Sequence, residues 1–279
     1  MRAELTEITV FPVKSTAGWR QDTALVEPIG LAGDRRWMVV GAGGECVTAR
    51  TDPGLLGIDA TSDGDDLILR CGGEEIRVAV PTEPLLEVTV HGRPLHGIPA
   101  APEVGEWVGE VIGRRDVRLV SLGRPRSLNP TRSQPGDATA FADAYPVTLA
   151  SRASLLRVQD WVVQSALDRG EDPTEIRMER FRPNLVIDGD LEAFEEETWH
   201  QVCVGDVTFD VAKLIDRCVL TTIEPHSLER GAEPIRSLAR HHSWDGKTWF
   251  GLQLIPRSTG RVAVGDPVAG QLNAATAAS

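Results

Sequence analysis

The chain has 279 residues, a formal net charge of −12 and a hydrophobic content of 41%, so it is long enough for one large or two ordinary domains with a sizeable core. The negative charge argues against non-specific binding to nucleic acid. No segment approaches the roughly 20 apolar residues of a membrane span, so no membrane association is expected.

The first hundred or so residues have the pattern of short β-strands separated by glycine-rich turns. This spacing predicts an antiparallel barrel or sandwich. Apolar residues at helical spacing then predict one short amphipathic helix over residues 103–112. The expected strands cover residues 4–12, 24–27, 36–40, 67–70, 76–80 and 86–90.

A polar segment over residues 122–142 is rich in Pro, Arg, Ser, Asp and Gly and has almost no apolar content, which is typical of a linker or a surface loop. A helix is expected to follow. Ser151 is a suitable N-cap, and the apolar face of the helix ends near Gly170.

Strands are expected again after Phe181, over residues 185–187, 199–204, 207–211, 217–223, 250–255 and 261–264. The predicted fold class is mainly β with minor α: two barrel-like parts joined by a polar loop and a helix. The expected divisions are a first domain over 1–120, the loop over 121–142, a second domain over 143–270 and a disordered tail over 271–279.

Cys218 is the cysteine whose neighbours point to chemistry. Arg217 precedes it, and a guanidinium favours the thiolate, which is both a nucleophile and a soft metal ligand. A buried inert thiol is the other interpretation. Asp216 is either a proton donor or the ion-pair partner of Arg217. Cys46, Cys71 and Cys203 lack metal-site spacing, and so few cysteines favour a reducing, cytoplasmic location.

Basic and polar residues gather at several expected strand ends of this acidic chain. Guanidinium forks and a lysine point charge suit a phosphate or another oxyanion, although each cluster alone also fits a solvated strand end. Strand alternation places Arg35 and Arg36 on opposite faces, so at most one of them lines a given pocket. Neither of the common glycine-rich nucleotide-binding motifs is present. The residues concerned are Lys14, Ser15, Arg35, Arg36, Arg50, Arg182 and Asn184.

These short motifs, in this order, resemble a known family. Residues 12–15, 30–37 and 48–50 resemble the N-terminal β-barrel domain that precedes MOSC domains. Residues 181–184, 204–206, 216–222, 250–251 and 264–268 resemble the MOSC domain itself, the molybdenum-cofactor sulfurase C-terminal domain that also occurs in the mitochondrial amidoxime-reducing component.

The resemblance implies a molybdenum cofactor of the molybdopterin type, with Cys218 as the protein ligand of the metal; pyridoxal phosphate is not expected. The pterin phosphate would be held by basic residues from both domains, foremost Lys14, Ser15, Arg35 and Arg182. Further cofactor-binding candidates are Arg36, Arg50, Asn184, Arg217 and Ser151, and helix capping explains Ser151 equally well.

The implied activity is the two-electron reduction of small N-hydroxylated or N-oxygenated compounds, with Cys218 and Asp216 as catalytic candidates and Asp216 as a proton relay. Because the chain ends at Ser279 without an iron–sulfur domain, we expect electrons from a separate ferredoxin, flavoprotein or cytochrome-type protein. The alternative is a carrier of the molybdenum cofactor or of persulfide sulfur on Cys218, without reductase turnover. Use of the same site in a pathway-specific biosynthetic enzyme stays open.

Overall fold

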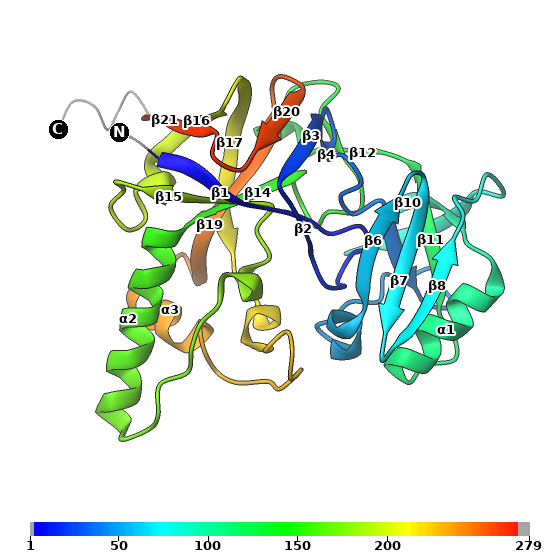
Figure 1. The fold of residues 1–279 in the computed structure, drawn as a ribbon, viewed down its shortest axis with the longest axis horizontal. Coiled ribbons are helices and arrows are strands. Elements are labelled where there is room, and N and C mark those ends of the chain that lie inside the picture. Colours follow the sequence, from blue (N-terminus) through cyan, green and yellow to red (C-terminus); the bar gives the residue numbers. More distant parts are fainter. Residues whose placement is uncertain (1–2, 273–279) are drawn as a thin grey trace.

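A computed structural model describes residues 3–272 and shows a mainly β protein with three α-helices in that range. Figure 1 shows two parts side by side: a strand barrel that carries α2 and α3, and a smaller β-rich part that carries α1. The predicted fold class is confirmed. None of the helices in residues 3–272 is long and apolar enough to cross a membrane.

The barrel is one sheet that closes on itself, because its last strand pairs back to its first. The buried side chains of these strands, among them Leu5, Phe209 and Leu252, fill the interior. Each strand alternates inward and outward residues, as a closed barrel requires. In spatial order the strands are β14 (Val147–Ser151), β15 (Leu185–Gly189), β1 (Ala3–Val10), β21 (Pro267–Leu272), β16 (Trp199–Val204), β17 (Val207–Asp216) and β19 (Lys247–Pro256).

The first strand of the chain lies in the barrel that the second half builds. β1 pairs with β15 and with β21. A second exchange joins β3 (Thr23–Glu27) and β4 (Gly30–Leu31) to β20 (Gly260–Ala263). The expected domain of residues 1–120 thus contributes strands to the sheets of the other half. The edge strands β2 (Trp19–Gln21) and β18 (Ser243–Trp244) extend β1 and β19.

The smaller part packs two sheets and α1 (Pro102–Ile112) around a core that includes Trp37, Leu55 and Val108. One sheet has the order β5 (Trp37–Val40), β11 (Arg118–Arg124), β10 (Arg93–Pro99) and β9 (Leu86–Val90). The other consists of β6 (Asp59–Asp63), β7 (Asp66–Cys71) and β8 (Glu74–Val78).

The connection between the parts contains the short hairpin of β12 (Arg126–Ser127) and β13 (Ala138–Thr139). α2 (Arg152–Arg169) follows, with Ser151 as its N-cap and Gly170, at φ +68°, as its C-cap. Both ends of this helix are where the sequence places them. α3 (Ile235–His241) is too short for its periodicity to stand out, and the sequence did not predict it.

Of two expectations about the second half, one is wrong and the other concerns residues that the structure describes only in part. The strand expected over residues 217–223 is wrong: β17 ends at Asp216, and a 3₁₀ helix spans Val219–Thr222. The hydroxyls of Thr221 and Thr222 donate to the carbonyls of Cys218 and Val219, which favours a turn over a strand. Of the expected tail, Gln271 and Leu272 belong to β21, and residues 273–279 lie outside the described residues.

Candidate functional site

A cavity of about 130 Å³ lies between the two parts, and both contribute to its walls. Six lysine or arginine side chains line it, against only two carboxylates. This excess of positive charge, in a chain of net charge −12, indicates a site for an anionic ligand. The charged and sulfur-bearing lining residues are Lys14, Arg35, Arg50, Asp143, Arg180, Arg182, Asp216, Arg217 and Cys218.

Cys218 lies between the end of β17 and the following 3₁₀ helix, with its side chain partly exposed at the cavity wall. Nε of Arg50 donates a hydrogen bond to its Sγ over 3.2 Å. A guanidinium at this distance favours the thiolate form of the sulfur. The cation that contacts the sulfur is therefore Arg50, which comes from the other half of the chain, and not the neighbouring Arg217.

Arg217 instead forms part of the wall. Its Nε and Nη1 donate to the carbonyl oxygens of Phe250 and Phe181, over 2.8 and 2.9 Å. Its Nη2 is buried and has no hydrogen-bond partner, and burial lowers the pKa of the guanidinium to about 9. No ion pair joins Arg217 to Asp216 within the described residues, since both carbonyl contacts turn the guanidinium the other way.

Asp143 is the residue on which Lys14, Arg50 and His91 converge, and the sequence did not single it out. Lys14 and Arg50 form ion pairs with its carboxylate, and His91 lies 3.1 Å from it. Burial raises the pKa of this carboxyl, but Lys14, His91 and Arg50 outweigh it and hold the pKa well below its ordinary value. The Asp143 side chain is 41% exposed, so an ionised carboxylate occupies the centre of the cation cluster at the cavity mouth.

Arg35 and Arg182 both lie over the same aromatic ring. Their guanidinium carbons lie 4.7 and 4.2 Å from the centroid of Phe11. Arg35 has an ion pair with Asp34, whereas the Arg182 side chain makes no hydrogen bond or ion pair within residues 3–272. Burial, and secondarily Arg35, lowers the pKa of Arg182 to about 9. Asp34 and Asp143 act on Arg182 without pairing with it, and an enclosed guanidinium that no carboxylate pairs with favours the binding of an anionic ligand.

Asn184 is fully buried and holds Arg35 in place from behind the cavity. Its Oδ1 accepts hydrogen bonds from Arg35 and from the backbone N–H and hydroxyl of Thr148. Its Nδ2 donates to Asp34 and to the carbonyl of Thr9. Asn184 is thus a joint between β14, β1 and the turn that carries Arg35, and it does not line the cavity.

Comparison with known proteins assigns the chain to a family. The sequence profile of the MOSC N-terminal beta barrel domain matches residues 2–115, and that of the MOSC domain matches residues 136–269. The chain belongs to the MOSC family. Mitochondrial amidoxime-reducing component 1 of Mus musculus is 31% identical over 94% of this chain and 80% of its own length.

Other MOSC proteins give similar values. The human amidoxime-reducing component 1 is 29% identical over 94% of this chain and 81% of its own length. The molybdenum cofactor sulfurase of Danio rerio is 30% identical over 91% of this chain, which corresponds to 32% of that larger relative. The similarity to all three extends over nearly the whole chain, so it covers both walls of the cavity.

Three candidates from the sequence lie outside the cavity of this MOSC protein: Asn184, described above, Arg36 and Ser151. Arg36 forms an ion pair with Glu27. Strand alternation does not explain this position, because Arg35 lies in the turn before β5, at φ +49°, and Arg36 directly precedes that strand. Ser151 is fully buried, and its hydroxyl caps α2 by accepting from the N–H of Ser154. Lys14, Ser15, Arg35, Arg50, Arg182, Asp216, Arg217 and Cys218 all line the cavity.

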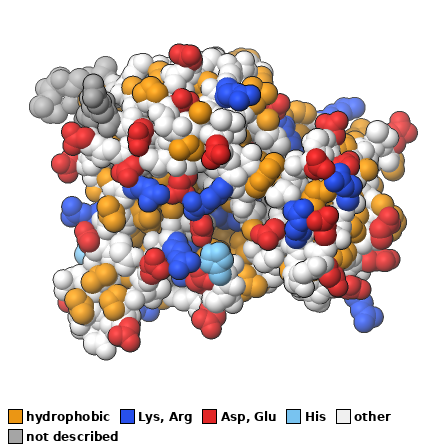
Figure 2. Space-filling model, viewed as in Figure 1, with side chains coloured by type: hydrophobic (Ala, Val, Ile, Leu, Met, Phe, Trp, Pro, Cys, Tyr) orange, Lys and Arg blue, Asp and Glu red, His pale blue; other side chains and the backbone are white. Residues whose placement is uncertain are grey.

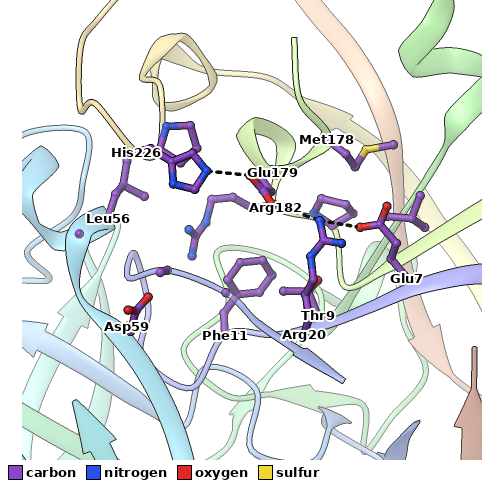
Figure 3. A pocket seen from close by; sticks show the side chains of 16 residues that line it. Glu7, Thr9, Phe11, Arg20, Leu56, Asp59, Met178, Glu179, Arg182 and His226 are labelled. Carbon is purple, nitrogen blue, oxygen red and sulfur yellow. Dashed lines mark hydrogen bonds and ion pairs between the residues drawn. The ribbon is translucent and has the colours of Figure 1, made fainter. Parts of the chain in front are cut away.

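A second cavity of about 360 Å³ lies on the other side of Arg182 (Figure 3). In this view Arg182 lies between Phe11 and His226, with Arg20 on the opposite wall. Arg20 lies 3.1 Å from carboxylate oxygens of both Glu7 and Glu179, so these acids are already paired. Arg182 is the wall that the two cavities share.

The described residues offer a metal ion very few ligands. Within residues 3–272, no three His, Cys, Asp or Glu side chains gather in a way that could hold a metal. Cys218 supplies one soft sulfur ligand and nothing more. A metal at this site would therefore bring its remaining ligands with it, as part of an anionic cofactor.

Proposed function

We propose that this MOSC protein is a molybdenum-cofactor-dependent reductase of N-hydroxylated or N-oxygenated compounds. The observation that carries the proposal is the pairing of one accessible thiol, held by Arg50, with a cation-lined cavity that has too few carboxylates. The names of the amidoxime-reducing relatives and of the cofactor sulfurase support it.

The residues present fit such a cofactor. Cys218 would bind the metal, and Lys14, Ser15, Arg35 and Arg182 would hold the pterin phosphate. The cavity, at about 130 Å³, is smaller than the roughly 300–1,000 Å³ of typical ligand pockets. Binding therefore requires side chains at its mouth to move, and the half-exposed carboxylate of Asp143 is the group that a phosphate would displace from the cations.

In the reaction that we propose, the N–O bond of the substrate breaks, two electrons and two protons are taken up, and water leaves. A bound molybdenum cofactor supplies the redox centre for this chemistry. The chain contributes the position of the site and the protons. Nε of Arg50 donates a hydrogen bond to the sulfur of Cys218, and the exposed carboxylate of Asp216, at the cavity edge, can pass protons from solvent to bound substrate.

Molybdenum content and turnover of a model amidoxime test this proposal together. Protein from a cofactor-competent host should contain about one molybdenum per chain and reduce the amidoxime with a chemical reductant. Cys218→Ala should lose both, whereas Cys203→Ala, on strand β16 of the barrel, should keep both. Full turnover by Cys218→Ala would refute the assignment.

A carrier of the molybdenum cofactor or of persulfide sulfur is the second candidate, favoured by the similarity to the cofactor sulfurase. The two candidates differ in one measurement. A carrier binds the cofactor or releases sulfur from Cys218 with cyanide, but it shows no turnover with any reductant.

A further inference from the structure

A groove of about 690 Å³ is lined by residues of β17, β18 and β19. Two of the three lysines of the chain, Lys213 and Lys247, line it. Arg132 lines it too, and Arg93 lies close enough to act on the charge of Lys213. We call Arg93, Arg132, Lys213 and Lys247, with Trp244 and Trp249, the basic groove.

The four cations of the basic groove have no ion-pair partner within residues 3–272. Elsewhere basic and acidic side chains are interspersed, as Figure 2 shows for one face. Two carboxylates also line the groove, but Glu197 is taken up by His242 at 3.0 Å, which leaves Asp245 alone. Burial is the main cause that lowers the pKa of Lys213; Lys247, Arg132 and Arg93 lower it further, and Asp216 acts in the opposite direction. The groove is thus a local positive region on an acidic protein.

The basic groove is directly connected to the thiol site. In the β17–β19 ladder, Asp216 pairs with Trp249, and Lys213 pairs with Gln253. Asp216 and Gln253 line the Cys218 cavity, so each rung has one residue in the groove and one at the cavity. Directly opposite residues of an antiparallel pair lie on the same face of the sheet, so the groove and the Cys218 cavity adjoin along this face.

Exposed aromatic side chains give the groove the composition of a contact surface. Trp244 is 42% exposed, and its ring lies 5.6 Å from that of Trp249. Nζ of Lys247 lies 5.5 Å from the Trp249 ring. Tryptophan is enriched in the cores of protein interfaces, and here the exposed Trp244 and the partly buried Trp249 both lie beside Lys247.

We propose that the basic groove is the docking surface for an acidic [2Fe–2S] ferredoxin that delivers electrons to the site beside Cys218. This inference rests on the proposed reductase function. Each docking event transfers one electron and oxidises one ferredoxin; two reduced ferredoxins and two solvent protons cleave one N–O bond and release one water. Complementary charge steers such an encounter, and salt weakens it.

A charge-reversal pair tests the inference in the molybdenum-loaded protein. Lys213→Glu/Lys247→Glu is compared with Arg157→Glu/Arg261→Glu, which makes the same charge change at exposed, unpaired positions on α2 and β20. At low ionic strength, kcat/KM for reduced plant-type ferredoxin should fall about tenfold in the groove variant and less than about twofold in the control. The rate with reduced methyl viologen, a small cation, should not fall in either variant.

Binding of the same ferredoxin, measured by calorimetry, gives a readout that does not depend on turnover. Wild type and control should bind it, and the groove variant should bind at least about tenfold more weakly. If the two variants bind ferredoxin equally well, or turn over equally fast with it, the basic groove is not the docking surface. Turnover with methyl viologen in those same variants would still support the proposed reductase function. Absence of turnover with both reductants in wild type would instead refute the proposed function, and absence of ferredoxin binding in wild type would refute the docking surface.

Discussion

Replacing Asn184 by alanine tests whether this buried amide joins the two halves of the protein. Its side chain takes part in five hydrogen bonds, three at Oδ1 and two at Nδ2. They reach β1, β14 and the turn with Asp34 and Arg35. The Asn184→Ala variant leaves Asp34 and Arg35, both of them largely buried and charged, with one partner fewer each.

The expected loss follows from these contacts. A buried hydrogen bond contributes about 1 kcal/mol net, and one to a charged partner contributes about 1.5–3 kcal/mol. Rearrangement of the unpaired groups offsets part of the sum, so we expect the free energy of unfolding to fall by about 3–5 kcal/mol. That is a large share of the roughly 5–15 kcal/mol of a typical domain.

Urea denaturation of both the Asn184→Ala protein and a matched Asn129→Ala protein measures this loss. Asn129 is exposed and makes a single capping hydrogen bond to the N–H of Thr131, so its replacement should cost at most about 1 kcal/mol. A difference between the two variants of less than about 1 kcal/mol would show that the Asn184 network does not hold the halves together.

Three further predictions concern single groups. Arg50→Gln should slow alkylation of Cys218 by iodoacetamide several-fold at pH 7, because the sulfur loses the guanidinium that donates to it. Cys46, whose pKa burial raises to about 11, should stay unmodified in both proteins. An unchanged alkylation rate of Cys218 would contradict the role of Arg50. Asp143→Asn should bind inorganic phosphate about tenfold more tightly by calorimetry, because the surrounding basic side chains lose their carboxylate; equal affinity would contradict the anion site. Burial raises the pKa of Glu196, so ionising this carboxyl destabilises the folded state as the pH rises above the ordinary carboxyl range. Glu196→Gln should therefore melt at a higher temperature than wild type at pH 7. The difference between the two melting temperatures should become smaller towards pH 4.

Local patterns predicted most of the secondary structure and most of the cavity lining. Alternation identified β1 and β9, and a capping serine and a terminal glycine marked both ends of α2. These signals lie within a few residues of each other, so the sequence displays them directly. The family resemblance, which rests on the order of the motifs, implied that Lys14, Arg35, Arg182 and Cys218 serve one site, and all four line one cavity.

The remaining features depend on contacts between distant residues. Arg50 and Cys218 are 168 positions apart, so nothing local reveals that Arg50, and not the adjacent Arg217, donates to the sulfur. Asp143 is one acid in a polar loop until the fold places three basic side chains around it. The strand expected over residues 217–223 failed because threonine hydroxyls bonded to nearby carbonyls instead.

The position of β1 has a consequence for how this protein is made. The strand leaves the ribosome first, yet its neighbours in the barrel are β15, from residue 185, and β21, from residue 267. Apart from its short pairing with β2, this apolar strand stays without its final partners until nearly the whole polypeptide has been synthesised. Such long-range closure slows folding and exposes strand edges during translation. The two neighbours of β1 therefore become available in turn, β15 before β21, and the barrel that supports Cys218 closes only once β21 lies between β1 and β16.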